Sequence, residues 1–229
     1  MKNSYLISFT IVAVAILGFI LAGKKTEAPM EKTGLAEEEQ GLTGLGNANF
    51  TDGKYNLDTS SSKILWEGEY LTGLKENGTV MLKSGEITVE NGLITEGSFV
   101  IDMNTIESIP HKDRLVSHLK NDDFFSVDIY PTATFVFKSM APTSEAGASE
   151  GRFVIAGDLT VRGITKPISF MSTLSGDEGA MSANASFAIN RADWEIKYNS
   201  PTFFGDLGEK IIRDAVSIGL DLKADKVIE

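Results

Sequence analysis

The chain has 229 residues, of which 42% are hydrophobic and 23% charged, a composition typical of one globular domain with additional segments. Its formal net charge of -11 argues against nucleic acid or an anionic membrane surface as the main partner, because both attract basic patches. The chain has no cysteine, which excludes disulfides, thiol catalysis and Cys-ligated zinc or iron–sulfur sites.

The first 23 residues have the pattern of an export signal or membrane anchor. Lys2 precedes an uncharged, apolar run over residues 5–22, as in a secretory signal. As a helix this run would span roughly 27 Å, close to the thickness of a bilayer core, so a cleaved signal and a retained anchor both fit. Lys24 follows Gly23 at the position where a lipoprotein would carry cysteine, so there is no thiol to which a lipid could be attached. We expect a periplasmic or otherwise extracytoplasmic protein.

Residues 24–52 differ in composition from the rest of the chain. They contain Glu37, Glu38 and Glu39, several glycines and few large apolar side chains. Such a segment buries too little surface to fold alone, which predicts a flexible linker with a reach of roughly 30 Å. The folded domain is therefore expected over residues 53–229.

From residue 53 onward, apolar and polar residues alternate with a period of two, which is typical of half-buried strands. The Asn91-Gly92 pair favours a type I′ hairpin turn, and Arg162-Gly163 is predicted as a second turn. The pattern predicts an all-β antiparallel barrel or sandwich of about eight strands, over residues 64–71, 86–90, 93–103, 133–138, 153–161, 168–174, 181–189 and 216–222. One short helix is expected around residues 111–121, where Leu115, Val116 and Leu119 share a side.

The predicted interior faces mix aromatic side chains with glycine and alanine. An eight-stranded barrel is just wide enough either to be filled by side chains or to hold one ligand. Small inward residues favour a cavity, whereas interdigitation of small and large residues favours a filled core. The alternation alone does not decide between a cavity and a filled core.

Four segments in chain order resemble the signature of the YceI-like, polyisoprenoid-binding family. They are SHLKNDDFF at residues 117–125, YPTATF at 130–135, GDLTVRGITKP at 157–167 and FAINRADW at 187–194. The resemblance runs from about Lys54 to Ala224. The stretches 143–150 and 205–210 differ in length from shorter family members.

The resemblance implies an extended lipocalin-like barrel whose hydrophobic tunnel holds a long isoprenoid or similar amphipathic lipid. It also implies export to the periplasm and, in some members, a homodimer. The residues expected to contact the lipid are the large inward side chains and one alanine: Trp66, Phe99, Ile101, Phe135, Phe137, Phe153, Ile155, Phe170, Ala185, Phe187 and Trp194.

Residues with catalytic or metal-binding chemistry are few. His111 and His118 would share a helix face, but solvent-exposed helix positions explain them better than a metal site, and no metal or cofactor is expected. Asp122 and Asp123 are interpreted as turn residues on opposite faces of the chain rather than an acid–base pair. Trp194, close to Arg191, either lines the tunnel mouth or plugs one end.

No nucleophile or phosphate-binding motif occurs, so no catalytic residue is assigned and an enzyme is not expected. The predicted function is non-catalytic binding, storage or transport of the lipid. The alternatives are a structural or adhesion module with a filled core and, as a weaker candidate, an enzyme acting on a lipid inside the barrel.

Overall fold

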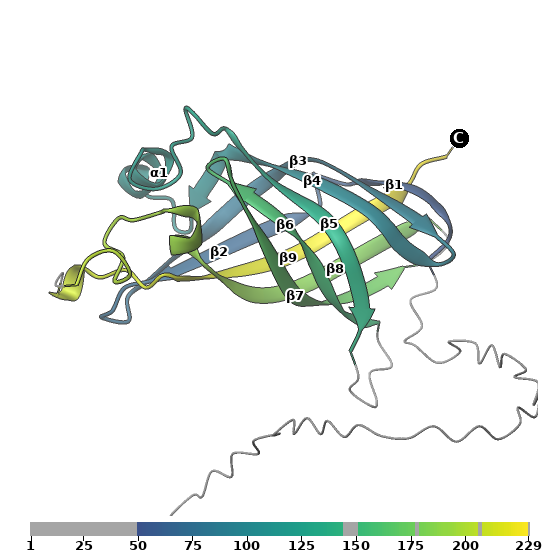
Figure 1. Cartoon of the computed structure of the whole chain (residues 1–229). Helices are drawn as coiled ribbons and strands as arrows, with labels where there is room; N and C mark the ends of the chain where they lie inside the picture. Colours follow the sequence, from purple (N-terminus) through teal and green to yellow (C-terminus); the bar gives the residue numbers. More distant parts are fainter. Residues whose placement is uncertain (1–49, 144–150, 177–178, 206–207, 229) are drawn as a thin grey trace, which may run out of the picture. The chain divides into compact units, whose positions relative to one another are not determined.

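The computed structural model describes residues 50–143, 151–176, 179–205 and 208–228 (Figure 1). The predicted signal or anchor over residues 1–23, and the predicted linker up to residue 49, lie outside these ranges. Nine antiparallel strands form one sheet: β1 (Gly53–Leu57), β2 (Lys63–Glu69), β3 (Lys75–Glu90), β4 (Leu93–Ser108), β5 (Thr132–Pro142), β6 (Arg152–Val161), β7 (Ile164–Gly176), β8 (Ala180–Asn190) and β9 (Ala215–Lys226). The helices are α1 (Asp113–Lys120) and the short 3₁₀ helices η1 (Arg191–Trp194) and η2 (Gly208–Lys210).

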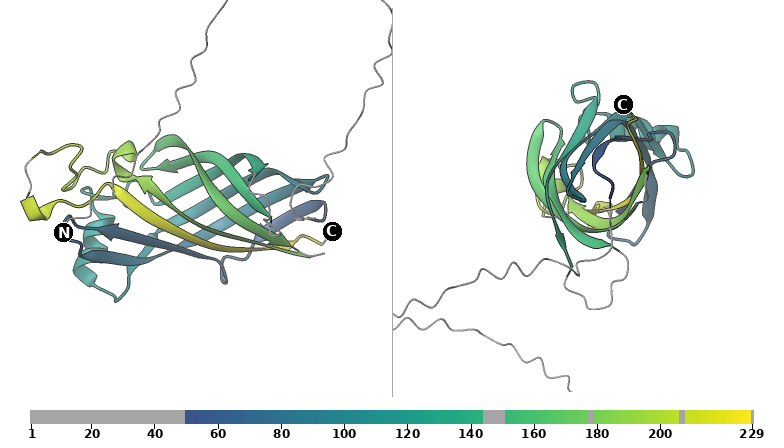
Figure 2. Two further views of the ribbon diagram at one scale, coloured as in Figure 1. Left: turned by 90° about the horizontal axis from the view of Figure 1, so that it is seen from below. Right: turned by 90° about the vertical axis from the view of Figure 1, so that its right-hand side faces the viewer.

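The sheet closes on itself. Its strand order is β1-β3-β2-β9-β8-β7-β6-β5-β4, and β3 also pairs with β4, which joins the two edges. Seen along its axis, the sheet forms a ring of strands (Figure 2). The predicted antiparallel barrel is confirmed.

The strands β1 and β2 share one position in the ring. Both pair with β3 on one side and β9 on the other: Tyr55 lies opposite Ile87, and Leu65 opposite Thr79. Nine strands therefore occupy eight positions, which agrees with the predicted number.

The turns between long strands follow from local chemistry. Asn91 and Gly92, between β3 and β4, have φ angles of 55° and 72°, and Arg162 and Gly163, between β6 and β7, have φ angles of 51° and 71°. Consecutive positive φ angles are what a type I′ turn requires, and only glycine, asparagine and aspartate reach this region readily. Both turn predictions are confirmed, with Arg162 in a conformation uncommon for its residue type.

The two ends of the barrel are built differently. Helix α1 and both 3₁₀ helices lie at one end, called here the helix end, while β1, the β3–β4 turn and the C-terminus lie at the other, called the C-terminal end (Figures 1 and 2). Helix α1 begins at Asp113, and it buries Val116 and Leu119 against the barrel, as the predicted helix requires. Within the described ranges, no helix has the length and hydropathy needed to cross a membrane.

Candidate functional site

A cavity of about 300 Å³ runs inside the barrel. Its lining extends along β4 from Ile94, near the C-terminal end, to Ile106, near the helix end. At about 3.4 Å per residue and a strand tilt of about 40°, this corresponds to roughly 30 Å along the axis. A cavity of this length and volume is narrow, so it matches the shape of a linear chain better than that of a compact ligand.

Large side chains are buried near both ends of the barrel, and its middle is hollow. At the C-terminal end, Phe50, Tyr55 and Val89 are at most 4% exposed, and at the helix end Trp194 is 2% exposed. Several inward side chains between these ends are only partly buried, although the strands cover them from outside: Phe99, Phe135, Phe170, Phe187 and Ile218. Their remaining accessible surface faces the cavity.

All but two of the predicted lipid-binding residues line this cavity. Those that do are Trp66, Phe99, Ile101, Phe135, Phe137, Ile155, Phe170, Phe187 and Trp194. Phe153 is buried beside Ser172 on β7 but does not reach the cavity. Ala185 shares the inward face with Ser172 and Leu220, which line the cavity, but does not reach it itself. The lipid contacts themselves stay predictions.

Four phenylalanine rings form a continuous row along the cavity wall. The centroid distances are 6.1 Å for Phe99–Phe135, 5.9 Å for Phe135–Phe170 and 4.2 Å for Phe170–Phe187, and the last pair is stacked at 10°. The rings come from β4, β5, β7 and β8. Such a row gives a hydrocarbon chain a large, rigid apolar surface.

The inward glycines differ in what they do. A Cβ built on Gly157 would lie 2.2 Å from Cζ of Phe135, and one on Gly97 would lie 3.1 Å from Cβ of Phe137. Gly157 therefore makes room for the ring of Phe135, whereas Gly97 lies close to Phe137 and also lines the cavity. At Gly68 a built Cβ meets no atom of the described residues within 4 Å, so this glycine opens onto free space in the cavity.

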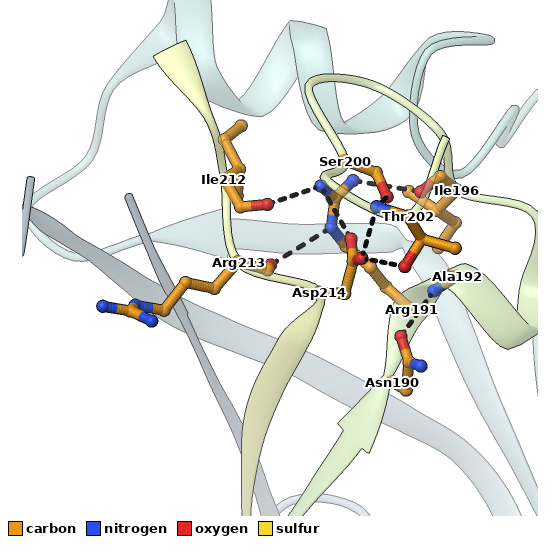
Figure 3. A network of polar contacts seen from close by, with 9 residues as sticks. All are labelled: Asn190, Arg191, Ala192, Ile196, Ser200, Thr202, Ile212, Arg213 and Asp214. Carbon is orange, nitrogen blue, oxygen red and sulfur yellow. Dashed lines mark hydrogen bonds and ion pairs between the residues drawn. The ribbon is translucent and has the colours of Figure 1, made fainter. Parts of the chain in front are cut away.

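A buried arginine fixes the wall at the helix end (Figure 3). Arg191 donates hydrogen bonds from Nε, Nη1 and Nη2 to the carbonyl oxygens of Arg213, Ile196 and Ile212, at 3.3, 3.0 and 2.9 Å. Its Nη2 also lies 3.3 Å from Oδ1 of Asp214. Burial lowers the pKa of Arg191, and the charge of Asp214 opposes this shift. The guanidinium is thus used for structure, although part of the side chain lines the cavity.

The indole nitrogens of the two tryptophans donate hydrogen bonds to backbone carbonyl groups of strands β4 and β6. Trp66 Nε1 donates to the carbonyl oxygen of Glu107 at 3.1 Å, and Trp194 Nε1 donates to that of Leu159 at 3.2 Å. Trp194 is buried and is also part of the cavity wall.

The histidines depart from the prediction of exposed positions on one helix face. His111 lies before α1 and is exposed, with its ring nitrogens 2.6 Å from Glu107 Oε2 and 2.8 Å from Asp113 Oδ1. His118 is partly buried, because its ring packs edge-on against Phe124 and Tyr198. No sequence pattern indicated this cluster, since Tyr198 is distant along the chain.

Asp122 and Asp123 lie in the turn after α1, as predicted. Both line a second, polar pocket of about 380 Å³ at the helix end, together with Arg162, Glu195, Lys197, Tyr198, Asn199 and Phe204. The sequence did not predict this pocket. Among the described residues, no group of three or more His, Asp or Glu side chains is placed to hold a metal ion.

Comparison with known proteins gives relatives along most of the barrel. A UPF0312 protein of Pseudomonas putida (strain GB-1) is 26% identical over 162 residues, which cover 68% of this chain and 82% of the relative. A UPF0312 protein of Photorhabdus laumondii is 36% identical over 94 residues, covering 41% of this chain and 45% of the relative.

Two solved structures share the fold. A polyisoprenoid-binding domain from Saccharophagus degradans, implicated in plant cell wall breakdown, aligns with a TM-score of 0.59 at 18% identity, over 76% of this chain and 98% of that domain. Burkholderia cenocepacia BcnA aligns with a TM-score of 0.55 at 16% identity, over 73% of this chain and 98% of BcnA. The sequence model of the YceI-like domain matches residues 55–224, nearly the whole described barrel, and the chain therefore belongs to the YceI-like family.

Proposed function

We propose that this protein binds the apolar chain of a long isoprenoid or similar amphipathic lipid inside its barrel and stores or transports it without chemical conversion. The observation that carries the proposal is the hollow, apolar middle of the barrel, which is lined almost entirely by hydrophobic side chains. The polyisoprenoid-binding domain of Saccharophagus degradans, which shares the fold, supports the choice of ligand class.

The energetics of such a site rest on burial alone. Each buried CH₂ contributes about 0.8 kcal/mol, so one five-carbon isoprene unit contributes roughly 4 kcal/mol before the cost of ordering the chain. A few units suffice for tight binding. Binding of this kind therefore needs no charged or nucleophilic group in the cavity.

The proposal is tested by extracting the purified protein with organic solvent and identifying the extract by mass spectrometry. We expect an isoprenoid or another long-chain amphiphile in stoichiometric amount. If the extract is empty, and the delipidated protein binds no apolar chain added back, the filled-core module becomes the better description.

We also propose that the protein acts outside the cytoplasm, because Lys2 followed by the apolar run over residues 5–22 has the pattern of an export signal. A periplasm-dependent reporter fused after Asp52 should be active. Activity only of a cytosol-dependent reporter would reject the proposal. The mass of the mature protein then distinguishes cleavage near Gly23 from a retained anchor, and light scattering tests the homodimer expected from the family resemblance.

A further inference from the structure

Two neighbouring loops lie beyond the strand ends at the helix end of the barrel (Figure 1). Residues 70–74 connect β2 to β3, and residues 199–205 lie between η1 and η2. Both are joined to the segment that follows η2, because the Leu71 N–H donates to the carbonyl oxygen of Ile211 and the Ile212 N–H donates to that of Asn199, each at 2.9 Å. We call residues 70–74 and 199–205 the apolar loops.

The apolar loops expose large hydrophobic side chains. Leu71 and Leu74 on the first loop, and Phe203 and Phe204 on the second, are between 39% and 59% exposed. Exposed connections are usually built from glycine, proline, asparagine, aspartate and serine, which set the geometry of turns. A single exposed apolar side chain is ordinary, but four on two adjacent loops indicate a surface that contacts another apolar phase.

The apolar loops are also free of charge. Residues 70–74 and 199–205 contain no Asp, Glu, Lys or Arg, although 23% of the chain is charged. The charged side chains beside them form ion pairs, with N–O distances of 2.6, 3.2 and 3.6 Å: Lys75–Glu67, Arg213–Glu69 and Lys197–Glu195. Paired charges do not attract a strongly anionic or cationic partner, so this surface matches an electrically neutral one.

The exposed area indicates a bilayer rather than a folded protein as the partner. About half of each of the four side chains is exposed, so together they offer roughly 400 Å² of apolar surface, since a whole aromatic side chain presents about 150–250 Å². A stable protein interface buries about 800 Å² on each partner. A bilayer needs no complementary shape, and apolar side chains enter its boundary between head groups and acyl chains to a depth of about 5–10 Å.

We propose that the apolar loops dock the helix end of the barrel onto an electrically neutral lipid bilayer. Leu71, Leu74, Phe203 and Phe204 enter the bilayer, and the ion pairs beside the loops stay in water. Docking requires no lipid in the cavity, so the inference goes beyond the proposed function.

The test exploits the absence of cysteine from the chain, because one introduced cysteine can be labelled alone with an environment-sensitive fluorophore. The full chain is labelled at Leu74→Cys or at Phe204→Cys and mixed with phosphatidylcholine vesicles that carry a quencher on the acyl chains. Both labels should shift their emission to the blue and be quenched. The matched control is Leu93→Cys, because Leu93 is similarly exposed, at 53%, but begins β4 at the C-terminal end. Its label should show neither change.

A second substitution tests the neighbouring loop. Phe203→Ser in the Leu74→Cys protein should reduce quenching of the label, because one of the four inserted side chains is lost. Met171→Ser removes a side chain of similar exposure from the outer surface of β7, and it should leave the quenching unchanged. Equal thermal midpoints confirm that both proteins are folded.

The charge of the vesicles tests the neutral partner. Quenching at Leu74 and Phe204 should be the same in about 0.1 M and 1 M salt, and phosphatidylglycerol in the vesicles should not increase it. Quenching only with phosphatidylglycerol, equal quenching at Leu93, or no quenching at either loop would overturn the proposal. Blue-shifted labels in a dimer without vesicles would assign the loops to a second copy of the chain instead. Each of these results leaves lipid binding in the cavity as a separate question, answered by extraction.

Discussion

At the scale of single residues, space in the cavity depends on which small residues are covered by neighbouring rings. Rings of Phe135 and Phe137 cover Gly157 and Gly97, but no side chain of the described residues covers Gly68. Replacing Gly68 therefore tests the cavity more directly than replacing Gly97 or Gly157.

We expect Gly68→Phe to abolish binding of an apolar chain while the barrel stays folded, because the new ring enters free space. Lipid content after extraction and the thermal midpoint are measured together. Gly219→Phe is the matched control: Gly219 lies on β9, and its built Cβ comes no nearer than 3.6 Å to Leu65, whose side chain is exposed on the outer surface. If Gly68→Phe keeps its lipid but costs about 1–3 kcal/mol of stability, as overpacking typically does, the core is filled at this point.

The buried pair of Arg191 and Asp214 should be among the most sensitive positions in the chain. Arg191→Leu removes the donor of the hydrogen bonds to three backbone carbonyl oxygens. It also removes the cation beside Asp214, whose Oδ1 already has no hydrogen-bond partner among the described residues. We expect a loss of about 3–5 kcal/mol in the free energy of unfolding, measured by urea denaturation. The double variant Arg191→Leu/Asp214→Leu should cost less than the sum of the two single variants. Additive costs would contradict a coupled pair.

At the scale of elements, β1 and β2 occupy one barrel position because the chain leaves the sheet between them. The carboxylate of Asp58 accepts hydrogen bonds from the backbone and hydroxyl of Ser60, at 2.9 and 2.6 Å, and from Ser61. Ser62 continues this anchoring, since its hydroxyl accepts from the backbone N–H of Lys223 on β9 at 3.0 Å. The serine run therefore fixes a turn.

Acid should weaken this turn selectively. Hydrogen bonds from Ser60 and Ser61 hold the pKa of Asp58 well below its usual range, so the folded-state pKa lies below the unfolded value of about 3.9. The stabilisation is fully present above about pH 5 and is lost as the pH falls toward the folded-state pKa. Asp58→Asn should therefore be less stable than wild type at about pH 7, and the difference should shrink below about pH 4 in urea midpoints. A constant difference across this range would contradict the assignment.

Sequence patterns predicted the barrel because its determinants are local. The period of two fixes which side chains face inward, and the Asn91-Gly92 pair is sufficient to predict its turn. The five-residue strand β1 was missed because only Tyr55 and Leu57 carry its pattern. The cluster of His118, Phe124 and Tyr198 was also missed, since it depends on how distant segments meet at the helix end. Glycine–ring pairs such as Gly157 with Phe135 likewise depend on contacts between strands.

At the scale of the whole barrel, the distribution of buried side chains along the axis determines where the cavity lies, and the number of strands does not. A closed sheet removes free edges, and large buried side chains near both ends leave the hollow part of the barrel in the middle. One of these buried end residues lies outside the predicted domain. Phe50 precedes the expected boundary at residue 53 by three positions, yet it is 4% exposed and its ring is next to Gly176 at the C-terminal end.

Two shortened chains test what Phe50 contributes to stability and to lipid retention. A chain beginning at Gly53 should still fold, because the closed sheet is complete, but it lacks Phe50 and the hydrogen bond from the Gly92 N–H to Asp52 at 2.8 Å. A chain beginning at Asn49 keeps both. We expect the shorter chain to lose about 3 kcal/mol in the free energy of unfolding, the lower value for deleting a buried phenylalanine side chain. Urea denaturation of both chains gives the difference, and Phe50→Ala in the full chain separates the ring from the loss of backbone. If Phe50 covers this end of the cavity, the shorter chain should also release bound lipid faster. Equal stability and equal release would mean that Phe50 packs against the barrel without closing it.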